Sequence, residues 1–155
     1  MDYRFAAEQD AGLILSFIRE LAKYENMLSQ VVAEEALLRH WIFEERKAEV
    51  IFALCDGKEV GFALFFHNFS TFLGRSGIYL EDLFVLPEYR RKGYGKALLK
   101  KLASIAAQRK CGRLEWCCLD WNRPSIDFYL SLGATAMSDW TVYRMAGDTL
   151  TDFAR

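Results

Sequence analysis

The feature that most constrains this chain is an apolar strand that leads through a glycine-containing turn into an amphipathic helix. The strand is expected over 78–86, because Pro87 cannot donate to a central ladder. The turn reads Arg90-Arg-Lys-Gly-Tyr-Gly95, and apolar residues at helical spacing continue to about residue 110. Glycines let a backbone approach an anion closely, and the first N–H groups of a helix have no helical partner. The stretch is therefore typical of an anion site.

Two carboxylates, Glu81 and Asp82, interrupt the apolar strand. Successive side chains of a strand point to opposite faces of the sheet, so we expect only one of the two to face a ligand. A carboxylate in a buried strand is costly without a partner or a role. One of them is therefore a candidate functional group, and the other a structural acceptor.

Composition narrows the class of protein. The chain has 155 residues, 52% of them hydrophobic, which predicts one domain over 1–155 with an ordinary core. A net charge of -1 gives no general electrostatic case for a nucleic-acid partner. The four cysteines are interpreted as small buried residues, and neither histidine has metal-ligand spacing, so no metal is expected. Without a signal-peptide pattern or an apolar run of roughly 20 residues, a soluble, cytoplasmic protein without a membrane partner is expected.

The order of expected elements is β-α-α-β-β-β-α-β-α-β-β. Strands are expected at 3–6, 50–55, 59–67, 78–86, 113–119, 134–137 and 140–145, and helices at 10–23, 33–44, from the turn to about 110, and 125–132. Asp56-Gly57 is typical of a hairpin turn, 68–77 is expected as a loop, and 113–119 as a strand buried on both faces. The order predicts an α/β fold, a mixed sheet covered by helices, with a ligand at the carboxyl ends of its strands.

Two familiar phosphate-binding motifs fail at the turn. A Walker loop needs glycine where Arg90 stands and a hydroxyl where Ala97 stands. A dinucleotide fingerprint needs a third glycine where Leu98 stands. The remaining pattern is R-x-x-G-x-G after a strand with a carboxylate pair.

This pattern resembles the acetyl-CoA-binding motif, Q/R-x-x-G-x-G/A, of the GCN5-related N-acetyltransferase (GNAT) family. Three further segments resemble its diamine acetyltransferase branch, which includes spermidine/spermine and thialysine acetyltransferases: ELAKYE at 20–25, YLEDLFV at 79–85 and WNRPSIDFY at 121–129. The resemblance implies the GNAT acyl-CoA N-acyltransferase fold, in which the central parallel strands splay apart.

The resemblance also implies how acetyl-CoA binds. Backbone N–H groups and cations of the turn would hold the pyrophosphate, from the set Arg90, Arg91, Lys92, Gly93, Tyr94, Gly95 and Lys96. The pantetheine arm would pair like an extra strand with Leu83, Phe84 and Val85, and an N–H there would face the thioester oxygen. Asn122 and Ser125 match CoA-contacting positions, although Asn122 could equally cap the short helix.

The resemblance implies catalytic and substrate-side residues as well. Tyr129 would be the general acid that protonates the departing thiolate, although on periodicity alone it could be a core aromatic. Glu81 would take the proton of the amine, directly or through water. Tyr24, Glu25 and Glu115 match positions on the amine side, where the two acids could also be ordinary surface groups.

The sequence therefore predicts an N-acetyltransferase that uses acetyl-CoA and direct attack by a primary amine of a small polycationic or amino-acid-like substrate. No cysteine stands where a covalent acyl carrier is expected. A protein amine or an antibiotic amine is an alternative acceptor, and a non-catalytic CoA-binding regulatory module is an alternative in another class. The resemblance also implies a homodimer with the terminal strands at its interface.

Overall fold

A five-stranded mixed sheet organises residues 1–117 of the structure, a computed structural model that describes residues 1–155. The strands follow chain order across the sheet: β1 (Asp2–Phe5), β2 (Glu49–Cys55), β3 (Lys58–Ser70), β4 (Arg75–Val85) and β5 (Leu114–Trp116). The first four are antiparallel to their neighbours, and β5 runs parallel to β4. The expected parallel crossover through a long helix is present, because α3 (Tyr94–Gln108) joins these last two strands.

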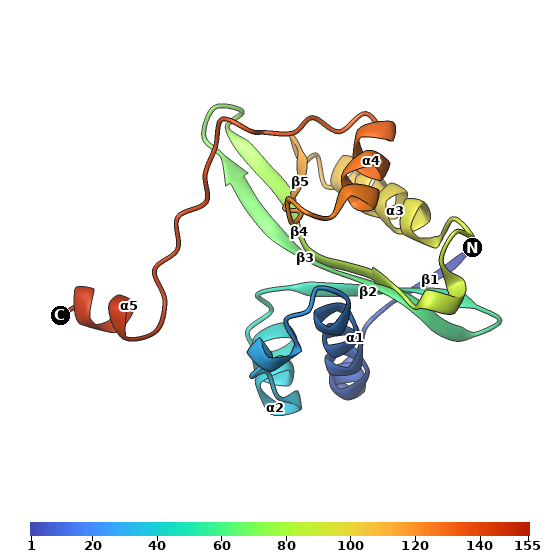
Figure 1. The fold of residues 1–155 in the computed structure, drawn as a ribbon, viewed down its shortest axis with the longest axis horizontal. Coiled ribbons are helices and arrows are strands. Elements are labelled where there is room, and N and C mark those ends of the chain that lie inside the picture. Colours follow the sequence, from blue (N-terminus) through green and yellow to red (C-terminus); the bar gives the residue numbers. More distant parts are fainter. The chain divides into compact units, whose positions relative to one another are not determined.

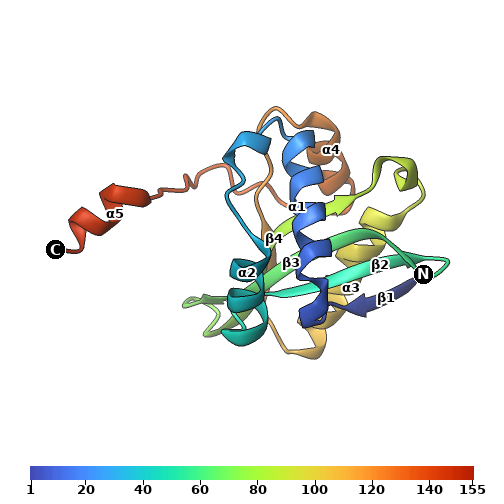
Figure 2. The same ribbon diagram turned by 90° about the horizontal axis from the view of Figure 1, so that it is seen from below.

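Helices cover both faces of this sheet (Figure 1). α1 (Ala11–Tyr24) and α2 (Glu35–Leu38) lie on one face, and α3 lies on the other. Under α1, the ring of Phe17 lies 5.1 Å from the Phe62 ring and 5.8 Å from the Phe52 ring. Each such fully buried side chain stabilises the fold by about 1.5–3 kcal/mol. Figure 2 shows α1 running across β2 and β3. None of the helices has the length and apolar character that a membrane span requires.

Several local predictions are confirmed and others are wrong. The Asp56-Gly57 turn is confirmed, since both residues have positive φ, at 50° and 79°. The helix expected at 33–44 is divided, with α2 followed by a π-helical segment at Arg39–Glu44. The loop expected at 68–77 is wrong, because pairing of Asn68 with Gly77 continues β3 and β4 to a turn at 71–74. A side chain at position 77 would collide with the Asn68 side chain, so glycine permits this pairing.

The edge strand β5 is shorter than the expected strand at 113–119. It pairs with β4 only from Ile78 to Leu80, and its residues are half-buried rather than buried on both faces. The reason is its place at the edge of the sheet, where a strand has a neighbour on one side only. Along Glu81–Val85, β4 consequently has no strand partner on that edge.

Residues 118–155 form a second unit, which holds α4 (Arg123–Ser131) and α5 (Gly147–Phe153). Asn122 caps α4 by accepting a hydrogen bond from the Ser125 N–H at 3.4 Å, and Gly133 follows with a φ of 88°, as the sequence predicts. The strands expected at 134–137 and 140–145 are wrong, and α5 was not predicted. Alternating apolar residues form a strand only when a second strand pairs with their backbone. Here they pair with none, and Trp140 and Tyr143 are exposed.

Candidate active site

A β-bulge at Glu81 shapes the centre of β4. Leu64 of β3 pairs with Asp82 and Phe65 pairs with Leu80, so Glu81 is an extra residue without a partner. An extra residue breaks the alternation of faces. Asp82 consequently shares a face with its partner Leu64, which packs against the core under α1. Strict alternation along β4 is therefore broken at Glu81, and the expectation that only one of the two carboxylates faces the ligand stays a prediction.

Three carboxylates gather where the end of α1 meets β4. Burial, together with the negative charges of Glu81 and Glu25, raises the pKa of Asp82 to about 6. Glu25 caps the carboxyl end of α1, and burial raises its pKa as well. None of the three forms an ion pair, and the three are not arranged to hold a metal ion. Their uncompensated negative charge suits an organic cation.

The edge of β4 beyond the bulge presents backbone groups that no neighbouring strand pairs with. The Leu86 N–H donates to the Val60 carbonyl at 2.9 Å, so the backbone of Leu86 faces β3. Alternation then directs the N–H and C=O groups of Leu83 and Val85 to the opposite edge, where β5 has already ended. Phe84 has its backbone toward β3 and its side chain in the core. An extended, amide-rich ligand could therefore pair with Leu83 and Val85.

The turn after β4 presents backbone N–H groups at the start of α3. The first hydrogen bond of α3 is donated by the Ala97 N–H to the Gly93 carbonyl at 3.0 Å, so the N–H groups of 94–96 have no helical partner. Gly93 has a φ of 86°, a left-handed conformation that favours glycine. At Gly95, a Cβ would meet only the Leu83 side chain, at an ordinary 3.9 Å. The fold alone therefore has room for a side chain there, and a bound anion would explain the glycine.

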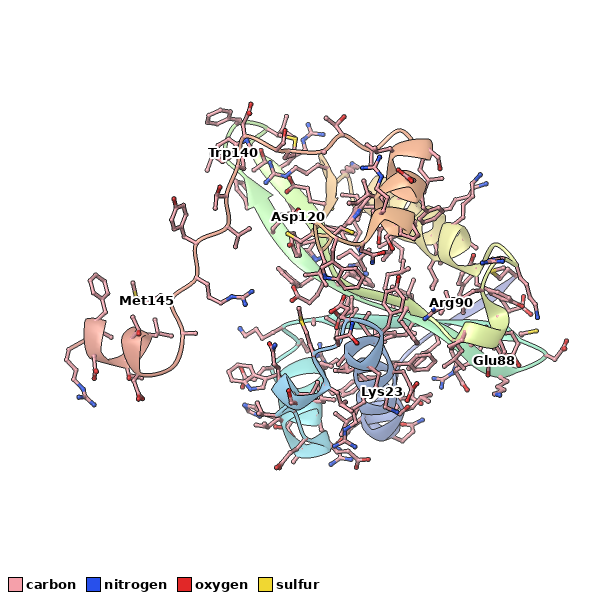
Figure 3. The ribbon with its side chains drawn as sticks, in the orientation of Figure 1. Lys23, Glu88, Arg90, Asp120, Trp140 and Met145 are labelled. Carbon is pink, nitrogen blue, oxygen red and sulfur yellow. The ribbon has the colours of Figure 1, made fainter.

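The charged residues of the turn divide into two groups. The side chains of Arg91, Lys92 and Lys96 are exposed, whereas Arg90 is half-buried. Arg90 Nε donates to the Val85 carbonyl at 3.0 Å, and its guanidinium lies over the rings of Tyr24 and Phe84, at 4.8 and 4.9 Å. Figure 3 shows the position of Arg90 beside the end of β4. Attraction of CoA by Arg90 stays a prediction, while its contacts tie the turn to α1.

The remaining predicted residues belong to β5 and α4. Glu115, on β5, pairs with Arg113 at 2.8 Å and accepts from Asn68 at 3.2 Å, so its charge is already compensated and its amine contact stays a prediction. Asn122 and Ser125 lie at the start of α4, and Tyr129 lies on α4 with its ring 5.5 Å from the Phe128 ring. The roles expected for these three residues also stay predictions.

The structure adds one polar contact that the sequence analysis missed. The Tyr79 hydroxyl donates to Cys117 Sγ at 2.9 Å. Burial and then this hydrogen bond raise the pKa of Tyr79, and the charge of Glu81 contributes. The two residues are 38 positions apart, and only the pairing of β4 with β5 brings them together, so no sequence pattern could have indicated the contact.

Comparison with known proteins identifies the family and the fold of the chain. The model of the acetyltransferase (GNAT) family matches residues 15–134. A thialysine N-epsilon-acetyltransferase of Bos taurus is 38% identical over 97% of this chain and 95% of its own length. An L-ornithine N5-acetyltransferase of Arabidopsis thaliana is 46% identical over 63% of this chain and 42% of its own length. A solved integron cassette protein from the mobile metagenome of V. cholerae is 31% identical, with a TM-score of 0.82, over 99% of this chain and 97% of that chain.

The family predicted from the R-x-x-G-x-G turn is confirmed, and so is the mixed-sheet fold that it implies. The family model spans strands β2 to β5, including the open edge of β4, and the helix α4 of the second unit. The chain belongs to the acetyltransferase (GNAT) family, as an N-acetyltransferase that takes its acetyl group from acetyl-CoA.

Proposed function

We propose that the acceptor is a primary amine of a small molecule that carries a second cationic group, such as a polyamine, ornithine or a thialysine-like amino acid. The observation that carries this proposal is the group of unpaired carboxylates, Glu25, Glu81 and Asp82, beside the open edge of β4. Two amines of this kind, thialysine and L-ornithine, are named for the relatives described above.

On the donor side, we propose two sets of backbone groups. Leu83 and Val85 pair with the amides of the pantetheine arm, as an added strand would. The N–H groups of 91–96 hold the pyrophosphate at the start of α3. A backbone N–H at the β4 edge also stabilises the negative charge that develops on the thioester oxygen. The open edge and the space at Gly95 support this assignment.

On the acceptor side, Glu25 and Asp82 attract the cationic groups of the substrate, and Tyr24 lies at the same end of α1. Glu81 takes the proton from the attacking nitrogen, directly or through a water molecule. The C–N bond forms as the C–S bond breaks, and Tyr129 donates a proton to the departing sulfur. The bulge supports the part given to Glu81, because the side chain is exposed on the strand whose edge is open.

A panel of amines with acetyl-CoA tests the acceptor class. Thialysine, L-ornithine and spermidine are compared with a lysine-containing peptide and an aminoglycoside, by release of free thiol and mass of the product. We expect release with at least one of the first three and acetylation of a single primary amine. Turnover with the peptide or the aminoglycoside alone would contradict the proposed class. Binding of acetyl-CoA without release across the panel would favour the regulatory module.

We also propose that the protein is a homodimer in which residues 134–146 pair with a second copy. The support is the apolar pattern of this segment, in which Trp140, Val142 and Tyr143 are exposed. Sedimentation velocity should give about twice the chain mass of 17.9 kDa. Val142→Ser combined with Tyr143→Ser should lower the mass to that of one chain. A control double variant of exposed polar residues outside the segment, Ser104→Ala with Thr149→Ala, should not. A wild-type monomer at micromolar concentration would contradict the dimer.

A further inference from the structure

Arg90 connects two parts of the proposed site that belong to different elements. Its Nε atom donates to the Val85 carbonyl, at the edge where the pantetheine arm is proposed to pair. Its guanidinium lies 4.8 Å from the centre of the Tyr24 ring, in the last turn of α1. The next residue, Glu25, is one of the unpaired carboxylates on the amine side. One side chain therefore contacts both the donor edge and the acceptor end of α1.

The Val85 carbonyl can serve Arg90 and a ligand together. A carbonyl oxygen has two lone pairs, so the hydrogen bond from Arg90 leaves one for an amide N–H of the pantetheine arm. Ordering of Val85 by a ligand would then also order the guanidinium. The guanidinium lies over the rings of Tyr24 and Phe84, so fixing its position would also restrict the Tyr24 ring.

The neighbouring cations of the turn do not share these contacts. Lys92 Nζ lies over the Tyr89 ring at 5.2 Å, and both Arg91 and Lys92 are exposed. Arg90 also forms no ion pair with Glu25, Glu81 or Asp82. Its contacts are those of a group that holds two elements in register rather than one that neutralises a charge.

We propose that Arg90 is a positioning residue that couples the two substrates: a CoA group bound along β4 orders the end of α1 through Arg90 and Tyr24. The coupling is reciprocal, so an amine held at Glu25 strengthens CoA binding by the same factor. This inference rests on the donor half of the proposed function. It does not depend on which amine is the acceptor.

Amide hydrogen exchange with CoA as the probe tests the coupling. In the wild type, CoA should slow exchange at 83–96, where it contacts the backbone. It should also slow exchange of the N–H groups of Glu25, Asn26 and Met27, which close the end of α1 on the Leu21, Lys23 and Ala22 carbonyls. Arg90→Met should retain the first effect and lose the second. Arg19→Met, an exposed arginine on the same helix, should retain both.

Two further measurements keep the test decisive. If Arg90→Met does not fold, Tyr24→Leu should show the same loss of the CoA-induced slowing of exchange at 25–27, because it removes the ring that the Arg90 guanidinium contacts. Arg90→Met should also raise the KM of the best amine of the panel about tenfold, with a much smaller change in the Kd of CoA.

The outcomes separate this inference from the proposed function. Slowing at 83–96 without any change at 25–27 in the wild type would overturn the coupling and leave the donor site standing. Retention of the change at 25–27 in Arg90→Met would also overturn it. No slowing at 83–96 in the wild type would overturn the donor site and the coupling with it.

Discussion

Tyr129→Phe should lower kcat by about 10²- to 10⁴-fold, the usual contribution of a positioned general acid, while the Kd of acetyl-CoA stays within about twofold. The phenol of Tyr129 is proposed to give its proton to the departing CoA sulfur, and phenylalanine has no proton to give. The ring itself is kept, so its packing beside Phe128 on α4 should survive. Thiol release with the best amine of the panel gives kcat, and calorimetric titration gives the Kd.

A second tyrosine of the same unit provides the control. Tyr143 is 92% exposed, so Tyr143→Phe removes a hydroxyl without touching α4. It should leave kcat unchanged. An unchanged kcat in Tyr129→Phe would remove the proposed acid, and the residue would then be a packing aromatic.

Asp82→Asn should raise the amine KM about 10- to 100-fold above pH 7, because it removes a half-buried charge that no protein cation neutralises. Burial raises the pKa of Asp82 to about 6, so the wild-type carboxyl is protonated below that pH and cannot pair with an ammonium. The wild-type amine KM should consequently rise as the pH falls through about 6. The variant should have lost this dependence, which a series of KM values from pH 5 to 8 measures.

The same substitution should stabilise the fold. The pKa of Asp82 is higher in the folded state than its ordinary 3.8, so folding favours the protonated carboxyl. The group therefore supports folding below about pH 4 and opposes it as the pH rises through about 6. Asp82→Asn removes this penalty and should raise the free energy of unfolding at pH 7.5 by about 1–2 kcal/mol, allowing for partial screening by water.

Urea unfolding at pH 7.5 and pH 4 measures this gain, with Asp2→Asn, on an exposed strand end, as the control that should show none. A lower free energy of unfolding for Asp82→Asn at pH 7.5 would contradict the claim that the Asp82 carboxylate has no partner that stabilises it.

Glu81→Gln tests the role of Glu81 separately from that of Asp82. It should move the pH–rate profile alkaline and raise the amine KM, and an identical profile would count against Glu81 as the base.

The backbone around the proposed donor site could be predicted because its signals are local. Gly93 adopts the left-handed conformation that its place in the motif indicates, and Pro87 follows the end of β4 within two residues. Asn122 and Gly133 likewise bound α4 where their capping preferences place them. Each of these depends on backbone chemistry within a few residues, which a single sequence records.

The acceptor half could be predicted only in part, because its geometry depends on distant pairing. The bulge at Glu81 arises from the register of β3 against β4, which also places Asp82 on the face that α1 covers, and no local pattern indicated either feature. Arg90 was predicted among the cations that attract CoA, and no local pattern indicated that its side chain lies over the rings of Tyr24 and Phe84. The strands expected at 134–145 are wrong for a related reason. Apolar alternation favours a strand, but no other segment of the chain pairs with this one.

The most direct test of the account compares a diamine with the monoamine of the same length. The ratio of kcat/KM for putrescine to that for n-butylamine measures what the second cationic group contributes to the transition state. We predict a ratio of about 10 to 100 for the wild type, equivalent to about 1.4–2.7 kcal/mol, and a ratio several-fold smaller for Glu25→Gln and for Asp82→Asn. A wild-type ratio near one, or a ratio that neither variant lowers, would contradict the central claim that these carboxylates select a dicationic amine.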